Sequence, residues 1–382
     1  MWALFPVLLH NLSTWGLEYF DDSLAALDNL ISREPGRFLT GADARGVRHV
    51  DAVFSLCARV LGDESVEDGD AVCAPQLIAV VLQHCRGGVD ALLDSALRLV
   101  AARLEGVRPA TDAFLRDTLL LVWAHALVYD ARQAVAVAAR AGVLAPLFRC
   151  LTTALAARRK TGKRSHFRRE QDKKAVAVAL GHLLLLPPGG APPEVEAARG
   201  AVLCAALQLL SDLKVQRDAR LKAEAEEEQG EEEEEEDSDD GDPAQQLEEE
   251  EEEERQAAAA SAPGWGEVPR RGAGVGPGAG VRAAGGDDDD DDDDDWSDFT
   301  AEEDGAAGPL DDIDPWVFLW DALQQSAAAD PARSDALHRQ LDFSAQAALH
   351  ALGGYAQTRR NELATEKAAT DAGAHTTTPK LN

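Results

Sequence analysis

The chain has 382 residues and a formal net charge of −32, but this charge is unevenly distributed. Residues 224–314 contain 38 of the 69 acidic residues and 4 of the 37 basic ones, which leaves 33 basic and 31 acidic residues elsewhere. The numbers exclude a uniformly acidic protein. The five cysteines, odd in number and without a CxxC pair, indicate neither a disulfide framework nor a zinc site.

The N-terminal segment "MWALFPVLLHNLSTW" predicts an amphipathic helix. A secretory signal is the alternative, but the segment lacks a basic n-region and an A-x-A cleavage site. The longest uncharged apolar run, residues 119–129, is too short to span a bilayer. We therefore expect a soluble protein that has no membrane partner.

Residues 1–157 show a helical period of apolar side chains almost throughout. Two stripes carry this prediction: Val50, Val53, Phe54, Cys57, Val60 and Leu61, and Val89, Leu92, Leu93, Ala96, Leu97, Val100 and Leu104. Helices follow one another about every 20 residues, which is typical of HEAT-type repeats, where each helical pair packs against the next. A four-helix bundle fits less well, because too many such helices are present.

A basic segment, residues 158–174, interrupts this pattern with nine Lys or Arg residues in seventeen. We predict an insertion loop without a fold of its own, with three interpretations left open. It is a nuclear localisation or nucleic-acid patch, a self-inhibitory partner of the acidic insert, or a solvated loop. Residues 175–222 return to the helical period and predict further HEAT helices.

The composition of residues 223–312 falls to Glu, Asp, Gly and Ala, which predicts a long acidic disordered insert. Helical periodicity resumes in residues 313–367, with Asp314 or Pro315 as a start signal, and predicts a C-terminal helical cap. Its apolar cluster, which we expect to pack on the end of the solenoid, consists of Trp316, Phe318, Leu319, Trp320 and Leu323. Residues 368–382 are predicted to be a disordered tail.

Three features together resemble the importin-beta superfamily of nuclear transport receptors, in particular its importin seven and eight subfamily. They are the opening pattern W-x-L-x-P, G-x-x-YF-x-D and AL-x-N, the segment "LQHCRGGVD" before a long amphipathic helix, and an acidic tract followed by "DDIDPW" and a helical pair. The resemblance implies an all-α HEAT solenoid and a C-terminal fragment of a longer receptor.

The resemblance also implies partners. The GTPase Ran would bind mainly N-terminal repeats that precede this part of a receptor, and Phe-Gly repeats of nucleoporins would bind between helices. Importin beta is a doubtful partner, because "TTTPKLN" lacks the Phe-Gly-type tail, and the basic segment is longer than the corresponding junction in relatives. Shuttling between nucleus and cytoplasm through the pores of the nuclear envelope is the implied localisation.

The acidic runs have the charge density of a nucleic-acid strand. An extended chain advances about 3.3–3.6 Å per residue, and a single strand carries a phosphate every ~3.4 Å. We therefore expect basic cargo, such as histones and ribosomal proteins, to bind the runs, with Trp296 and Phe299 adding cation–π contacts. The alternative is a solubilising linker. The candidate contacts are Glu231, Glu232, Glu233, Glu234, Glu235, Glu236, Glu248, Glu249, Glu250, Asp287, Asp288, Asp289, Asp290, Asp291, Asp292, Asp293, Asp294, Asp295, Trp296 and Phe299.

Catalysis is not predicted. The segment "GAGVGPGAG" does not have the spacing of a dinucleotide-binding loop, and no other common catalytic motif occurs. We expect no enzyme activity, no cofactor, no specific metal site and no direct contact with nucleic acid. The predicted function is a nuclear import receptor for basic cargo, and the alternative is a stand-alone acidic chaperone or scaffold without shuttling.

Overall fold

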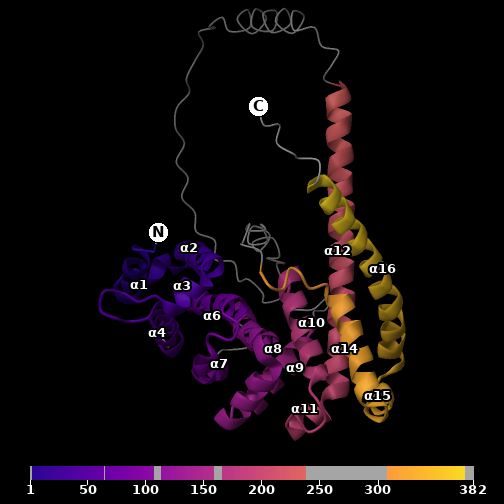
Figure 1. Ribbon diagram of the computed structural model, residues 1–382, viewed down its shortest axis with the longest axis horizontal. Coiled ribbons are helices and arrows are strands. Elements are labelled where there is room, and N and C mark those ends of the chain that lie inside the picture. The colour runs from indigo at the N-terminus through magenta and orange to yellow at the C-terminus, as the bar shows by residue number, and fades with distance from the viewer. Residues whose placement is uncertain (1, 64, 107–112, 159–165, 238–307, 375–382) are drawn as a thin grey trace, which may run out of the picture. The chain divides into compact units, whose positions relative to one another are not determined.

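The computed structural model describes residues 2–63, 65–106, 113–158, 166–237 and 308–374 (Figure 1). The chain divides into two compact units, one comprising Met1–Arg217 with Glu302–Asn382 and the other Asp218–Ala301. The described residues are helical apart from turns, loops and an isolated bridge between Ala42 and Arg48.

The first unit begins with short helices joined by tight turns. They are α1 (Phe5–Thr14), the 3-10 turn η1 (Leu17–Tyr19), α2 (Phe20–Arg33), α3 (Pro35–Thr40), α4 (His49–Gly62), α5 (Asp68–Ala71) and α6 (Cys73–His84). The predicted stripe on α4 faces the core: Val53, Cys57 and Val60 are fully buried, while Phe54 packs at its edge.

The central part of the first unit contains the longer helices. They are η2 (Asp90–Leu92), α7 (Leu93–Gly106), α8 (Ala113–Ala141), α9 (Leu144–Ala156), α10 (Glu170–Leu185), α11 (Pro193–Ala197) and α12 (Arg199–Asp237), whose residues after Arg217 belong to the second unit. α8 is two helices joined at Asp130, whose extended backbone (φ −161°, ψ 99°) breaks the helix. The Asp130 carboxylate then accepts the backbone N–H of Gln133 at 2.8 Å, as an N-cap does.

The chain returns to the first unit with α14 (Pro315–Ala329), α15 (Pro331–His338) and α16 (Phe343–Ala374). α14 and α15 both start with an Asp-Pro pair. The Asp314 carboxylate accepts N–H groups of Trp316 and Val317, and the Asp330 carboxylate accepts that of Arg333. The predicted start of the cap at Asp314 or Pro315 is confirmed.

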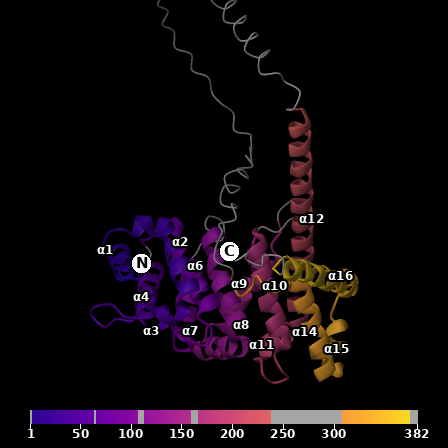
Figure 2. The same ribbon diagram turned by 45° about the horizontal axis from the view of Figure 1, so that its top comes forward.

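The helices of the first unit pack on their neighbours in chain order around one continuous core. α4 contacts α6 and α7, α8 contacts α6, α7 and α10, α10 contacts α14, and α14 contacts α16. Both views show this succession from α1 to α10 (Figures 1 and 2). The predicted all-α helical-repeat solenoid is confirmed.

Several predicted boundaries differ from the structure. The predicted basic loop, residues 158–174, ends earlier, because α10 begins at Glu170. Both ends of the predicted disordered insert, residues 223–312, contain ordered structure: α12 continues to Asp237, and Leu310 is buried in the core, while residues 238–307 lie outside the described residues. α16 extends to Ala374, into the predicted tail. Glu and Ala favour helix, which carries α12 and α16 beyond the apolar stripe on which the predicted boundaries were placed.

Within the described part of the chain, no helix by itself is long and apolar enough to cross a membrane. α8 and α9 are long and apolar enough only when they are taken together, and the two helices are bent by 117° at their junction. Many residues of both helices are buried inside the solenoid.

Candidate functional site

Most of the predicted basic-cargo contacts lie outside the described residues. This applies to Glu248, Glu249, Glu250, Asp287, Asp288, Asp289, Asp290, Asp291, Asp292, Asp293, Asp294, Asp295, Trp296 and Phe299. Glu231, Glu232, Glu233, Glu234, Glu235 and Glu236 lie in the last turns of α12, in the second unit. Their role in binding stays a prediction.

The structure does show how the chain is fixed on either side of the acidic tract. Trp316, at the start of α14, is buried and donates its indole N–H to the backbone carbonyl of Leu210 in α12 at 3.2 Å. Its ring meets the edge of Tyr355 from α16, with ring centroids 5.3 Å apart. The two segments of the first unit that flank the tract are therefore joined directly in the core.

A buried ion pair fixes the same junction. Arg359 of α16 donates to the Asp314 carboxylate at 2.8 Å, and also to Glu362. Burial lowers the pKa of Arg359, but its bonds to Asp314 and Glu362 outweigh that effect and raise it. Asp314 thus has two roles, since it caps α14 and neutralises a cation that is only 8% exposed.

Lys174 of α10 lies beside the acidic segment that precedes α14. Its ammonium donates to the backbone carbonyl of Asp311 at 3.3 Å. Burial lowers the pKa of Lys174, and the carboxylates of Asp311, Asp314 and Asp312 oppose this shift. A basic residue of the predicted insertion loop is therefore part of the anchor for the "DDIDPW" segment.

The described end of the basic segment is folded, contrary to the prediction of a loop without a fold of its own. Phe167 is fully buried, at a positive φ of 54°, and its N–H donates to the Asp117 carboxylate at 3.0 Å. The His166 ring nitrogen is 2.5 Å from the other oxygen of Asp117. Lys173 is also buried and donates to the carbonyl of Arg168 at 3.0 Å. Residues 159–165, on which the self-inhibition hypothesis also depends, lie outside the described residues.

The predicted apolar cluster of the cap packs against the solenoid, as expected. Trp316, Leu319 and Leu323 are buried, and Phe318 packs on Gly181 of α10, where an added Cβ would lie 2.6 Å from its ring. The ring of His182 lies 4.9 Å from that of Phe318, which places this histidine at the flank of the core.

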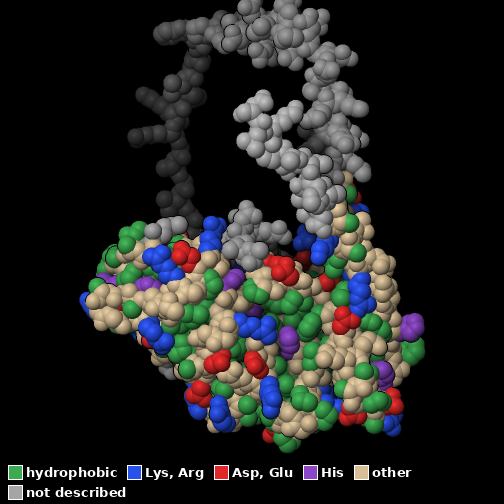
Figure 3. Space-filling view, in the orientation of Figure 1, with side chains coloured by type: hydrophobic (Ala, Val, Ile, Leu, Met, Phe, Trp, Pro, Cys, Tyr) green, Lys and Arg blue, Asp and Glu red, His purple; other side chains and the backbone are tan. Residues whose placement is uncertain are grey.

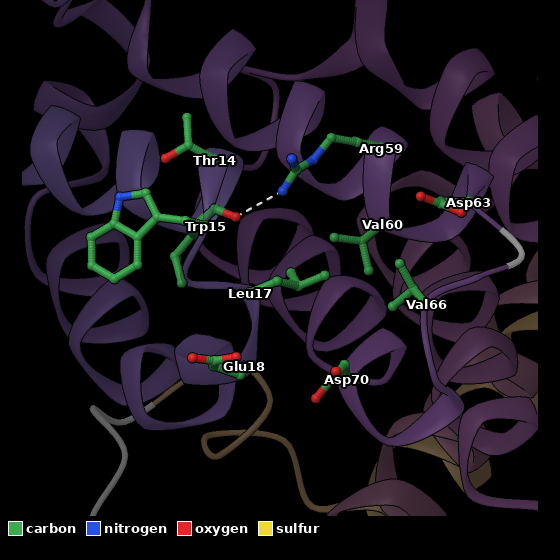
Figure 4. A pocket seen from close by; sticks show the side chains of 10 residues that line it. Thr14, Trp15, Leu17, Glu18, Arg59, Val60, Asp63, Val66 and Asp70 are labelled. Atoms are coloured by element: carbon green, nitrogen blue, oxygen red, sulfur yellow. Dashed lines mark hydrogen bonds between the residues drawn. The ribbon is translucent and has the colours of Figure 1, made fainter.

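The opposite end of the first unit contains a surface pocket of about 340 Å³ between the end of α1 and the segment that joins α4 to α6 (Figure 4). Leu17, Val60 and Val66 lie in a row across it, as Figure 4 shows. Trp15, 68% exposed, lies at one end. The polar lining residues are Thr14, Glu18, Arg59, Asp63 and Asp70.

The charged groups of this pocket differ in their partners. Arg59 is engaged, because it donates to the backbone carbonyls of Leu12, at 2.7 Å, and Ser13 at the end of α1. Asp63 accepts the hydroxyl and the N–H of Ser65, and these bonds hold its pKa below the usual value. No ion pair within the described part of the chain involves Glu18 or Asp70.

Sequence reasoning missed both this pocket and the details of the junction. The residues of the pocket come from separate helices and loops between Leu12 and Asp70, and no spacing in the chain links them. The one available signal is Trp15, a large aromatic residue directly after the end of α1. In the described residues no group of three His, Cys, Asp or Glu side chains could hold a metal ion.

The fold defines the class of protein: a helical-repeat solenoid that ends in a helical cap, with the two chain segments that flank an acidic tract joined in its core. Positive and negative side chains are interspersed over the face of the molecule that Figure 3 shows, in keeping with the nearly neutral composition of the chain outside residues 224–314.

Comparison with curated proteins places this chain among the relatives of importins. It is 33% identical over 224 residues to the importin beta-like SAD2 homolog of Arabidopsis thaliana, covering 59% of this chain and 21% of that protein. It is 27% identical over 233 residues to human importin-8 and 23% identical over 228 residues to the probable importin-7 homolog of Dictyostelium discoideum. Each of these two matches covers 59% of this chain. They cover 21% of human importin-8 and 20% of the Dictyostelium discoideum protein.

The predicted resemblance is confirmed: over 59% of its length, the chain is similar to proteins that are named importins. It spans about a fifth of the length of these curated relatives. No protein-family profile matches the chain, and no solved structure does.

Proposed function

We propose that this chain is the C-terminal part of a nuclear import receptor that binds basic cargo and carries it through the nuclear pore under the control of Ran. The observation that carries the proposal is the combination of importin-named relatives over 59% of the chain with acidic runs at residues 231–236, 248–254 and 287–295. The protein has a binding and transport role rather than a catalytic one, and it shuttles between nucleus and cytoplasm.

The fixed flanks of the tract support this function. Because Trp316 contacts Leu210, the two ends of the intervening chain start from one place on the solenoid. Any cargo held by the acidic runs is thereby kept at a high local concentration beside the helical repeats. Basic cargo such as histones or ribosomal proteins would release counterions from the runs, and its binding would weaken as salt increases.

Replacement of the nine aspartates at 287–295 by asparagine tests the acidic runs, and nine glutamates at the same positions provide the control of equal charge. Binding of a histone is measured by fluorescence anisotropy at several salt concentrations. We expect the asparagine variant to bind more weakly and with a smaller salt slope, and the glutamate variant to bind as the unmodified chain does. Equal affinity and slope for all three would contradict the proposal.

The second candidate is a stand-alone acidic chaperone or scaffold for basic proteins. The same acidic runs favour it, because they need no transport partner to bind cargo. Import of a fluorescent histone into permeabilised cells, and binding to nucleoporin Phe-Gly repeats and to Ran-GTP, separate the two. The same assays are repeated with the chain joined to any coding sequence upstream of it in its gene. Histone binding without import or repeat binding in both forms would favour the chaperone.

A further inference from the structure

The pocket between α1 and the α4–α6 connection has a surface suited to one long cationic side chain. Its floor is apolar, because Val60 is fully buried and Leu17 and Val66 are half-buried beside it. A floor of this kind accommodates the aliphatic stem of Arg or Lys, whose charged end stays near water.

The charges at the rim favour a cation. Glu18 and Asp70 have no ion-pair partner in the described structure, and Asp63 is held ionised by Ser65. In the view of Figure 4, Glu18 and Asp70 lie along one side of the apolar row. The single lining cation, Arg59, is already bonded to carbonyls at the end of α1 and neutralises no more than part of this charge.

The exposed indole of Trp15 favours arginine over lysine. An indole with 68% exposure at the mouth of a pocket is available for stacking. A guanidinium stacks on an aromatic face and also bonds carboxylates with a planar fork, which a compact ammonium group does not do.

We infer that this pocket binds an arginine side chain from an extended segment of a partner protein, with the stem on Leu17, Val60 and Val66 and the guanidinium between Trp15 and the carboxylates of Glu18 and Asp70. The inference rests on the proposed function for the basic character of the partner. It assigns that partner a docking site on the folded repeats, separate from the acidic tract.

The test uses the full chain labelled with 5-fluorotryptophan, with the Trp15 resonance assigned from a Trp15→Phe variant. A short Gly-Ser peptide with one central arginine is titrated in and followed by ¹⁹F NMR, and the same peptide with citrulline, which is neutral and of equal shape, is the matched probe. We expect the arginine peptide to shift the Trp15 resonance and the citrulline peptide to leave it in place. Equal shifts with both peptides would overturn the inference.

Variants locate the binding energy. The double change Glu18→Gln with Asp70→Asn is expected to weaken arginine-peptide binding about tenfold, whereas Glu194→Gln with Asp335→Asn, the same charge change on α11 and α15, leaves it unchanged. Trp15→Ala, measured by peptide anisotropy, is expected to weaken binding about three- to fivefold. Phe343→Ala is its control, since Phe343 is 88% exposed elsewhere.

The outcomes separate this inference from the proposed function. Binding of the arginine peptide should persist in the variant with nine asparagines at 287–295, so loss of histone binding there does not bear on the pocket. Conversely, the pocket variants could leave binding of the arginine peptide unchanged while histone binding stays salt-sensitive. That result would overturn the inference about the pocket and leave the proposed function standing. Tighter binding of a leucine peptide than of the arginine peptide would also overturn it and identify an apolar docking site.

Discussion

Trp316 donates its indole N–H to the carbonyl of Leu210 across 106 residues of sequence, which joins the chain before the acidic tract to the chain after it. The ring is only 6% exposed and stacks edge-on against Tyr355. The acidic tract is therefore an insertion between two helices, α12 and α14, that share one core.

The first prediction concerns this contact. Trp316→Phe removes the hydrogen bond and keeps most of the packing, so we expect a loss of about 1 kcal/mol in the free energy of unfolding. Trp316→Ala also empties a buried space and should cost about 3–5 kcal/mol. Urea unfolding followed by circular dichroism measures both, and equal stability of the two variants would show that the ring does not pack in the core.

The second prediction concerns the ion pair between Asp314 and Arg359. Asp314→Ala removes the N-cap of α14 and leaves the buried guanidinium with Glu362 alone, so we expect a loss of about 2–4 kcal/mol. Asp321→Ala is the control, because it breaks the exposed pair of Asp321 with Arg360. That change should cost less than about 1 kcal/mol. Similar effects of the two variants in urea unfolding would contradict the buried role of Asp314.

The third prediction compares adjacent glycines of α16. A Cβ on Gly353 would lie 2.9 Å from the Trp320 ring, whereas one on Gly354 would meet nothing within 4 Å. Gly353→Ala should therefore separate α16 from α14 and destabilise the cap by about 1–3 kcal/mol. Gly354→Ala should stabilise it by up to about 1 kcal/mol, because alanine favours helix. Thermal unfolding of both variants is the measurement, and the same sign for both changes would contradict the packing of α16 on Trp320.

The fourth prediction concerns pH. Burial lowers the pKa of His125 to about 4, while the unfolded chain should have the ordinary value of about 6.5. As the pH falls from 6.5 to 4, the unfolded state takes up a proton on His125 that the folded state does not. This uptake lowers the free energy of unfolding by up to about 3 kcal/mol over that pH range. The His125→Gln variant should lack this loss.

Asp172 acts in the opposite direction, because burial raises its pKa to about 6. As the pH falls from about 6 to 4, the folded state takes up a proton on Asp172 before the unfolded state does, which raises the free energy of unfolding. The His125 effect is therefore measured as the difference between the unmodified chain and His125→Gln, by urea unfolding at pH 4.5, 5.5 and 7. A difference that stays constant over this range would exclude a buried neutral His125.

The helices of this protein could be predicted from local pattern alone. The stripe from Val50 to Leu61 places one face of α4 in the core, and the Asp-Pro pair at 314–315 places the start of α14. Such features depend on residues a few positions apart, and helix periodicity and capping are properties of a single turn or two. The acidic tract is likewise a matter of composition.

Contacts between distant residues were decided by the tertiary structure. The basic segment predicted a loop without a fold of its own, yet Phe167 is buried and its N–H donates to Asp117, 50 residues earlier. Lys174 contacts Asp311, 137 residues later, and the pocket at Trp15 combines α1 with the loop after α4.

The sequence by itself thus determined that the chain forms amphipathic helices around an acidic insert, and it indicated the importin-beta family. The tertiary structure alone decided which charges are buried as pairs and which carboxylates remain open to a partner. The physical reason is that burial and charge pairing depend on which helices meet in space, and a periodic apolar stripe does not specify its neighbour.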